Sequence, residues 1–250
     1  MSEPPRPDPI RPDPIRPDPI RPDPIRIVLV GATGLIGTTL IGRAVGRERY
    51  RLTAIARREA ALPEGARMEM LVADPANWGQ AIAAADASVI VIALGTTWRA
   101  SGTNEAVFRA TDKDLVLACA QAAKAARVRH CIAVSSVGAA ISSRGLYLRV
   151  KGEVEDALAK LKFARLDILR PGLLRGPRAE RRPAEKLAML ATPLVDCLLH
   201  GGLRKYRSVR ATAVADAILQ LALEKPRGRF IHEHDAIMRA AGRLEPSSRR

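Results

Sequence analysis

The most constraining stretch of this sequence is a short apolar run followed by three regularly spaced glycines. Residues 27–30 read Ile-Val-Leu-Val, which is too short and too β-branched for a helix and is typical of a strand buried on both faces of a parallel sheet. Residues 31–37 then read Gly-Ala-Thr-Gly-Leu-Ile-Gly, and a helical pattern follows over residues 35–45. A strand, this glycine pattern and a helix in that order predict a phosphate-binding turn for a dinucleotide.

Each glycine of this turn has a predicted task. Gly31 permits the tight turn, Gly34 lets the backbone approach a pyrophosphate, and Gly37 lets the helix lie close to the strand. The free N–H groups at the start of the helix then face the negative charge. The alternative is a plain structural turn, since turns collect glycine for many reasons. The cofactor-binding residues predicted here are Gly31, Thr33, Gly34, Leu35, Ile36 and Gly37.

The composition fits one α/β domain in a reducing compartment. A chain of 250 residues with 47% hydrophobic content is long enough to bury a core of its own. The three cysteines, Cys119, Cys131 and Cys197, lie inside apolar segments, with neither a Cys-x-x-Cys pair nor a signal peptide. We therefore expect buried thiols and a cytoplasmic location. Without an apolar run of roughly 18 residues, we expect no membrane span.

The strongly basic charge raises the question of nucleic-acid binding. The formal net charge is +15, but the basic residues are scattered, with local concentrations at residues 175–182 and 202–210. Only 3% of residues are aromatic, so base-stacking surfaces are scarce. We therefore expect no nucleic-acid partner and interpret most of the charge as a solvated surface.

Residues 6–25 are four copies of Arg-Pro-Asp-Pro-Ile. Proline lacks the amide donor and fixes φ, so this segment can form neither a helix nor an inner strand. It is either a low-complexity extension without a role in the chemistry, which we favour, or a spacer or ligand for a protein partner. The expected organisation is a disordered tail at residues 1–25, a dinucleotide-binding domain at 26–240 that includes a substrate lobe at about 175–210, and a frayed end at 241–250.

Two arginines predict which dinucleotide binds. Residues 52–56 form a second short strand, which ends in Arg57 and Arg58. About 20 residues beyond the glycines, an NAD site places an acid against the ribose 2′-hydroxyl, whereas an arginine suits a 2′-phosphate. NADP is therefore expected in preference to NAD. The alternative is that the arginines simply cap a strand at the surface.

Two further strand ends supply cofactor-binding candidates. Strands are predicted at residues 68–73 and 88–94, and in an open parallel sheet ligands lie beyond the carboxyl ends of the strands. Asp74 follows the first of these strands, where it could meet an adenine amino group or a loop N–H. The second strand contributes Leu94, Gly95 and Thr96.

A Tyr-x-x-x-Lys pair suggests the chemistry. Tyr147 and Lys151 begin a predicted helix at residues 147–161, and a spacing of four puts them on one face. An unperturbed tyrosine has a pKa of about 10, and a neighbouring ammonium favours the phenolate, so the pair is suited to proton transfer at a carbonyl or alcohol oxygen. Ser136, or its neighbour Ser135, ends the predicted strand 130–134 and could hydrogen-bond the same oxygen. Alone, the pair would more often be helix surface.

These residues resemble the short-chain dehydrogenase/reductases, and within them the atypical members related to the Tat-interacting-protein-like oxidoreductases. The resemblance covers residues 26 to about 238 and rests on Gly31-Ala-Thr-Gly34, Leu94-Gly-Thr-Thr97, residues 112–117, Val134-Ser-Ser136, residues 146–155 and residues 169–173.

The resemblance implies a fold and roles for individual residues. The fold would be a doubly wound parallel Rossmann α/β sheet with helices on both faces and a small C-terminal substrate-side lobe. Ser136, Tyr147 and Lys151 would be catalytic, Lys151 would also hold the nicotinamide ribose, and Pro171 and Leu173 would line the nicotinamide pocket. Where conventional members have an asparagine that holds a relay water, Asp112 is the nearest match.

The sequence thus predicts an NADPH-dependent oxidoreductase that acts on a carbonyl or alcohol of a small molecule. The alternatives are an NADPH-binding regulatory protein with little turnover and a nucleotide-sugar epimerase-like isomerase. His232-x-His234 would place two imidazoles on one side of a strand, but the sequence indicates no third ligand, so no metal site is expected.

Overall fold

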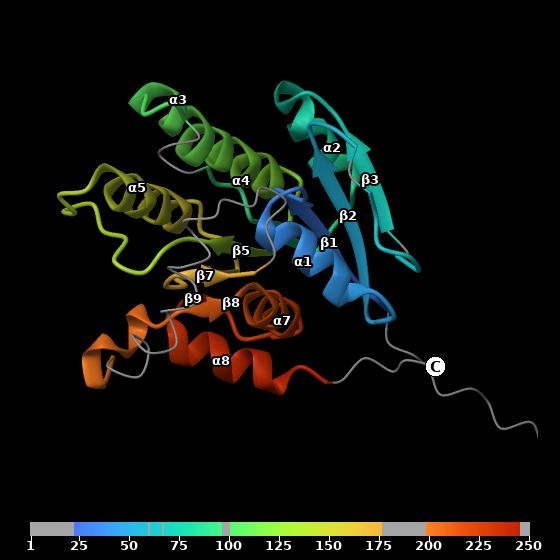
Figure 1. Cartoon of the computed structure of the whole chain (residues 1–250). Coiled ribbons are helices and arrows are strands. Elements are labelled where there is room, and N and C mark those ends of the chain that lie inside the picture. Colours follow the sequence, from blue (N-terminus) through green and yellow to red (C-terminus); the bar gives the residue numbers. More distant parts are fainter. Residues whose placement is uncertain (1–22, 60, 67, 97–100, 177–198, 246–250) are drawn as a thin grey trace, which may run out of the picture.

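The computed structural model describes residues 23–59, 61–66, 68–96, 101–176 and 199–245, and its centre is a seven-stranded sheet (Figure 1). Its strands are β1 (Ile25–Val30), β2 (Tyr50–Ala56), β3 (Met68–Val72), β4 (Val89–Ile92), β5 (His130–Val134), β6 (Arg165–Leu169) and β9 (Gly228–His232). All neighbouring pairs are parallel, in the order β3-β2-β1-β4-β5-β6-β9. The predicted doubly wound Rossmann α/β fold is confirmed.

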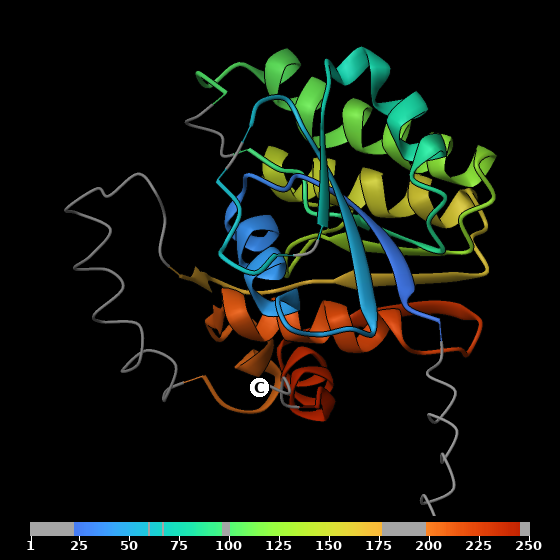
Figure 2. The ribbon, with the colours of Figure 1, turned by 90° about the vertical axis from the view of Figure 1, so that its right-hand side faces the viewer.

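Helices cover both faces of the sheet (Figures 1 and 2). They are α1 (Leu35–Ala44), α2 (Trp78–Ala84), α3 (Glu105–Arg109), α4 (Leu115–Ala125), α5 (Leu146–Lys160), α7 (Ala211–Ala222) and α8 (His234–Arg243). Helices α2, α4 and α5 share one apolar core with the sheet, and α1, α7 and α8 share the other. One π-helical turn, Ala110–Asp114, joins α3 to α4.

The first strand shows why an unbroken apolar run was needed. Ile27 and Leu29 face the core of α1 and α7, whereas Val28 and Val30 face the core of α2, α4 and α5. All four are at most 1% exposed. Because successive side chains of a strand point to opposite faces, a strand with helices on both sides must be apolar at every position.

The strand order locates a ligand crevice. Strand β1 lies between β2 and β4, so the chain winds outward in one direction from β1 to β3 and in the other direction from β4 to β9. In open α/β sheets ligands bind at such a switch point, outside the carboxyl ends of the strands. The turn that follows β1 carries the three glycines at this place.

The expected boundaries need correction at both ends. Ile25, which was assigned to the tail, belongs to β1 and pairs with Tyr50. Residues 241–243, which were assigned to the frayed end, belong to α8, whose buried residues are Ile237 and Ala240. The repeats up to residue 22 and residues 246–250 lie outside the described residues.

The expected substrate lobe also lies in part outside the described residues, at 177–198. Its described remainder consists of a two-stranded parallel pair, β7 (Leu174–Arg175) with β8 (Val209–Arg210), and a 3-10 turn at Gly201–Tyr206. This turn packs against α8.

Candidate active site

The glycine turn is shaped by close backbone contacts. Gly31 has φ of +92°, and a Cβ built on it would lie 2.6 Å from the carbonyl carbon of Ala93, just beyond β4. A Cβ on Gly37 would lie 2.2 Å from the carbonyl oxygen of Gly31. The sequence-based tasks of these two residues are therefore confirmed, because no larger side chain fits there without moving the backbone.

The start of α1 is suited to an anion. Gly34 precedes the helix, has no side chain to cap it, and donates its N–H to the carbonyl of Gly31 at 3.1 Å. The next N–H groups, of Leu35, Ile36 and Gly37, belong to the first helical turn, where an α-helix offers no acceptor of its own. No acidic residue lies in this turn, so nothing there competes with a phosphate. Thr33 is exposed beside it.

The two arginines after β2 lie at the same edge of the sheet. Strands β1 and β2 are parallel and in register, so their carboxyl ends are adjacent, and Arg57 and Arg58 are both exposed there. Asp74 has a structural role: its Oδ1 accepts the N–H of Ala76 at 2.9 Å. Of its two predicted roles, the contact to a loop N–H is present.

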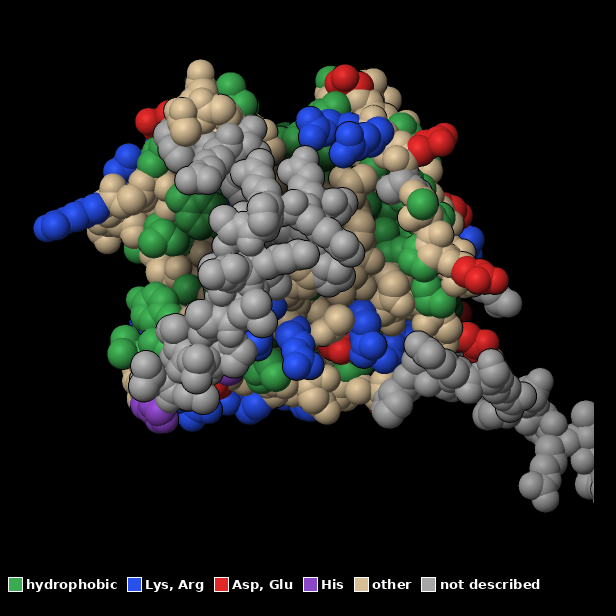
Figure 3. All heavy atoms as spheres, viewed as in Figure 1, with side chains coloured by type: hydrophobic (Ala, Val, Ile, Leu, Met, Phe, Trp, Pro, Cys, Tyr) green, Lys and Arg blue, Asp and Glu red, His purple; other side chains and the backbone are tan. Residues whose placement is uncertain are grey.

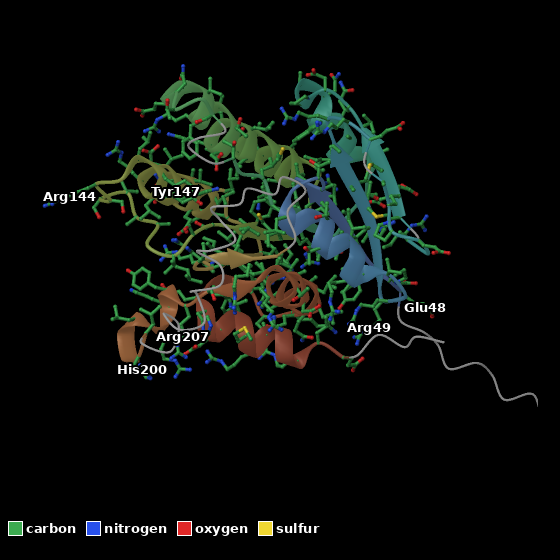
Figure 4. The ribbon with its side chains drawn as sticks, in the orientation of Figure 1. Glu48, Arg49, Arg144, Tyr147, His200 and Arg207 are labelled. Carbon is green, nitrogen blue, oxygen red and sulfur yellow. The ribbon has the colours of Figure 1, made fainter. Side chains whose placement is uncertain are left out.

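Tyr147 and Lys151 are brought together as their spacing predicts. Both lie in the first turns of α5, and Lys151 Nζ is 5.9 Å from the centroid of the Tyr147 ring. Tyr147 is 37% exposed, and its ring packs at 5.9 Å from that of Phe108 in α3. Figure 4 shows Tyr147 at the start of α5. The tyrosine is thus open to solvent while the lysine below it is buried.

Asp112 is the residue whose importance the sequence understated. It is fully buried in the π-helical turn, and its Oδ1 lies 2.9 Å from Lys151 Nζ. Its Oδ2 accepts the backbone N–H of Thr96 at 2.7 Å. One carboxylate therefore joins the segment after β4 to the lysine of α5. Leu94 and Gly95 precede that contact, whereas Thr97 lies outside the described residues.

A second ionic group fixes α5 to the helices beside it. Glu153 lies 2.8 Å from an Arg109 guanidinium nitrogen and 2.7 Å from Lys113 Nζ. Hydrogen bonds from Arg109 and Lys113 lower the pKa of Glu153 to about 2. The helix that carries Tyr147 and Lys151 is therefore tied to the end of α3 and to the π-helical turn.

The two serines after β5 differ in their surroundings. Ser135 donates its hydroxyl to Glu155 Oε1 at 2.5 Å, and that buried carboxylate also pairs with Arg170. Hydrogen bonding to Glu155 raises the pKa of Arg170. Among the described residues, the one hydrogen bond of the Ser136 hydroxyl is a long contact of 3.5 Å to the carbonyl of Val137. Ser135 is thus already engaged in a structural network.

The segment after β6 lies beside the end of β5. Pro171 is buried, and its carbonyl accepts the N–H of Val137 at 3.0 Å. A Cβ on Gly172 would lie 2.4 Å from the carbonyl oxygen of Arg207, so the chain passes close to the 3-10 turn here. Leu173 is 54% exposed and available to a ligand.

The two histidines of the His-x-His pattern contact different acidic side chains. His232 ends β9, and His234 begins α8, so they do not share one side of a strand as expected. His232 Nε2 lies 2.7 Å from Asp167 Oδ1, whereas His234 Nδ1 lies 2.8 Å from Asp235. Among the described residues, no three His, Cys, Asp or Glu side chains are grouped to hold a metal.

Asp167 is the centre of a buried charge cluster that the sequence did not indicate. It is fully buried in β6 and contacts His130, His232 and Arg165 at 2.5–2.7 Å. Burial alone would raise the pKa of Asp167, but hydrogen bonds from these three side chains outweigh it and hold the pKa well below its ordinary value. The cluster ties β5, β6 and β9 together, outside the predicted catalytic group.

The described cysteines are inert thiols. Cys119 and Cys131 are free and buried, and burial raises the pKa of Cys119 to about 12. This confirms the expectation for these two, while Cys197 lies outside the described residues. In the part of the chain that the structure describes, no helix combines the length and the apolar character needed to span a membrane.

Comparison with known proteins settles the family. Residues 31–225 match the family described as NAD(P)H-binding. The chain belongs to this family. It is 39% identical over 166 residues to Protein HTATIP2 of Rattus norvegicus, which covers 65% of this chain and 68% of the relative. It is also 34% identical over 169 residues to the mitochondrial protein fmp52 of Emericella nidulans, covering 65% and 72%.

These relatives and the fold make this NAD(P)H-binding chain an atypical short-chain dehydrogenase/reductase of the HTATIP2 branch, as the sequence motifs predicted. Among solved structures it resembles UDP-N-acetylglucosamine 4-epimerase from Methanobrevibacter ruminantium M1, with a TM-score of 0.64, 14% identity, and coverage of 84% of this chain and 77% of the other. WbmH of Bordetella bronchiseptica in complex with NAD+ has a TM-score of 0.63, 14% identity, and coverage of 84% and 75%. At such identities the likeness shows the fold alone.

Proposed function

We propose that this protein is an NADPH-dependent oxidoreductase that interconverts a carbonyl and an alcohol on a small molecule. The observation that carries the proposal is the buried Asp112–Lys151 pair at 2.9 Å, which holds the lysine beneath the more exposed Tyr147. The carboxyl edge of the sheet suits a dinucleotide, because Gly31 and Gly37 allow a tight turn with close backbone contacts before an uncapped helix start.

Each residue of the site has its own role in the proposed reaction. Tyr147 exchanges a proton with the substrate oxygen, and the ammonium of Lys151 stabilises the phenolate charge that this exchange creates. Ser136 holds the same oxygen, since the hydroxyl of Ser135 is committed to Glu155. NADPH, when bound, supplies the hydride. Pro171 and Leu173 line the pocket for its nicotinamide.

The cofactor preference rests on Arg57 and Arg58. Both are exposed at the carboxyl end of β2, beside the glycine turn, where a guanidinium can bind a 2′-phosphate through two hydrogen bonds. The double change Arg57→Ala and Arg58→Ala should weaken NADPH binding by about tenfold or more and leave NADH binding within a few fold. Titration calorimetry with each coenzyme measures this.

Arg129→Ala is the matched control for that titration. Arg129 is also exposed but precedes β5, at the amino edge of the sheet, so its loss should change neither affinity. Equal weakening of NADPH and NADH in the double variant would show that the arginines do not distinguish the two. Absence of heat with both coenzymes for folded wild-type protein would remove the proposal itself.

The enzymatic part has its own test. Tyr147→Phe keeps the ring beside Phe108 and removes only the hydroxyl, so NADPH affinity should stay within a few fold while oxidation of NADPH by carbonyl substrates falls by about 100-fold or more. Unchanged turnover in this variant would contradict the assigned role. Tight NADPH binding without turnover on any carbonyl compound would instead favour the regulatory alternative.

A second candidate function is isomerisation of a nucleotide sugar, because several structural neighbours are nucleotide-sugar epimerases. They include UDP-glucose 4-epimerases in complex with NAD. An isomerase would convert UDP-glucose without net consumption of coenzyme, whereas the oxidoreductase consumes one NADPH per product.

The cytoplasmic location stays a prediction supported by the buried thiols, while the fungal relatives are named mitochondrial.

A further inference from the structure

A pocket of about 400 Å³ is lined by residues other than those of the glycine turn. Its walls come from the β7–β8 pair and from the first turns of α7 and α8, and residues 31–37 are not among its described lining residues. Its volume falls within the range of small-molecule sites, which is about 300–1,000 Å³. It is therefore large enough for an organic ligand rather than an ion alone.

The lining of this pocket is cationic. It contains Arg175, Arg207 and Arg210, together with His234, and no carboxylate among the described lining residues. Arg207 is anchored by its Nε, which donates to the carbonyl of Leu199 at 2.8 Å. The nearby acid Asp235 is already paired with His234 and Arg204. We call this site the arginine pocket.

Arg210 is the residue most available to a ligand. Its backbone pairs with β7, but its side chain is exposed and, within the ranges that the structure describes, makes no hydrogen bond or ion pair. Figure 4 shows Arg207 near the start of α8, and Figure 3 shows Lys and Arg side chains along the lower part of the same face. Several guanidinium groups around one cavity repel each other, so a bound anion would relieve that repulsion.

The backbone adds to this charge. Helices α7 and α8 both begin at the pocket, since Ala213 lies in the first turn of α7 and His234 is the first residue of α8. The first turn of α7 contains no acidic residue, and its N-cap, Arg210, makes no capping hydrogen bond. The first turn of α8 carries Asp235, which offsets the dipole of that helix, so it is the positive end of the α7 dipole that acts on the same volume as the arginines.

The rest of the lining is apolar. Val209 and Ala213 contribute small side chains, and Met238 is 46% exposed at the rim. Planar guanidinium groups and helix starts match the oxygens of a phosphate, whereas the apolar side chains suit a hydrocarbon part. We propose that the arginine pocket binds a small organic phosphate, with its phosphoryl group at the arginines and its apolar part against Met238.

Titration calorimetry with two probes, inorganic phosphate and phenyl phosphate, separates the contribution of the arginines from that of the apolar side chains. Arg210→Gln should weaken both by about tenfold, because one charge-assisted contact is lost. Met238→Ser should weaken phenyl phosphate by about threefold and leave inorganic phosphate unchanged. Both residues are exposed, so both variants should fold.

The controls test the location and the source of the phosphate. Arg229→Gln makes the same charge change on an exposed arginine of β9 and should leave both affinities unchanged. Arg210→Gln should weaken the binding of both probes by the same factor with and without saturating NADPH, since the start of α1 is not part of the pocket. The proposal is independent of whether NADPH binds.

The phosphoryl group could belong to a soluble metabolite or to a lipid headgroup. Binding of phenyl phosphate that Arg210→Gln weakens assigns the pocket to a soluble ligand. Binding only to phosphatidylcholine vesicles that contain phosphatidic acid would overturn this assignment. Equal effects of Arg210→Gln and Arg229→Gln, or the absence of binding by wild-type protein, would overturn the proposal as a whole.

Discussion

Among single substitutions at the site, Asp112→Ala should give one of the largest decreases in the free energy of unfolding. The substitution leaves the ammonium of Lys151, whose side chain is 7% exposed, without its counter-ion. It also removes the acceptor of the Thr96 N–H. Breaking a buried ion pair on one side costs about 3–5 kcal/mol, and an unpartnered buried N–H costs about 1–3 kcal/mol.

These two costs overlap, so the free energy of unfolding should fall by about 3–5 kcal/mol. For a chain of this size that lowers Tm by roughly 10 °C. Asp112→Asn keeps an acceptor for Thr96 and removes only the charge, so its loss should be smaller. Urea denaturation, followed by circular dichroism, measures all three proteins.

Asp114→Ala is the matched control, because Asp114 lies in the same π-helical turn but is exposed. It should stay within about 0.5 kcal/mol of wild type. The cause is tested by adding Lys151→Met, which removes the uncompensated ammonium and should recover part of the stability lost by Asp112→Ala. A decrease in the free energy of unfolding of less than about 1 kcal/mol for Asp112→Ala would show that the ion pair does not stabilise the site. The same conclusion would follow if Asp112→Ala lowered this free energy equally in the Lys151→Met and wild-type backgrounds.

The remaining predictions concern the charge cluster in β6 and the glycine turn. Hydrogen bonds hold the pKa of Asp167 below its value in the unfolded chain. The stabilisation from Asp167 is therefore complete above about pH 4 and is lost as the pH falls further. Asp167→Asn should flatten the dependence of the free energy of unfolding on pH in this acid range, as measured by urea titrations. An unchanged acid slope would contradict this. Gly37→Ala, whose Cβ would lie 2.2 Å from a carbonyl oxygen, should lower stability by more than about 2 kcal/mol and abolish coenzyme binding. Gly42→Ala, in the same helix with nothing within 4 Å, should instead raise stability by about 0.5–1 kcal/mol, and similar effects of the two changes in thermal melts would refute the steric argument.

The sequence was most informative where a local pattern alone determines the structure. The run at residues 27–30 must be buried on both faces, and the glycines after it meet steric limits set by a few neighbouring atoms. The spacing of Tyr147 and Lys151 follows from helix geometry. These features were correctly predicted because each depends on a few adjacent residues.

Long-range pairs were not predictable in the same way. Asp112 and Lys151 lie on different helices, and Asp167 meets side chains from β5 and β9. Apart from Arg165, which lies two residues before Asp167, the partners of the two aspartates are far away in the sequence. For strand β9, only a strand through His232 and His234 was expected, because an edge strand with Arg229 and His232 among its five residues lacks the apolar run of the inner strands. The basic residues at 202–210 did give a signal, but only the fold shows that they share a cavity with Arg175.

The central position of β1 determines how the protein can be tethered. The chain enters this strand at Ile25, at the amino edge of the sheet, whereas the glycine turn opens at the opposite edge (Figure 2). A tag or a surface coupled ahead of Ile25 would therefore be separated from the crevice by the height of the strand, which is about 20 Å for six residues. Attachment at that end leaves the coenzyme side free, so immobilised protein is suited to screening ligands by surface plasmon resonance.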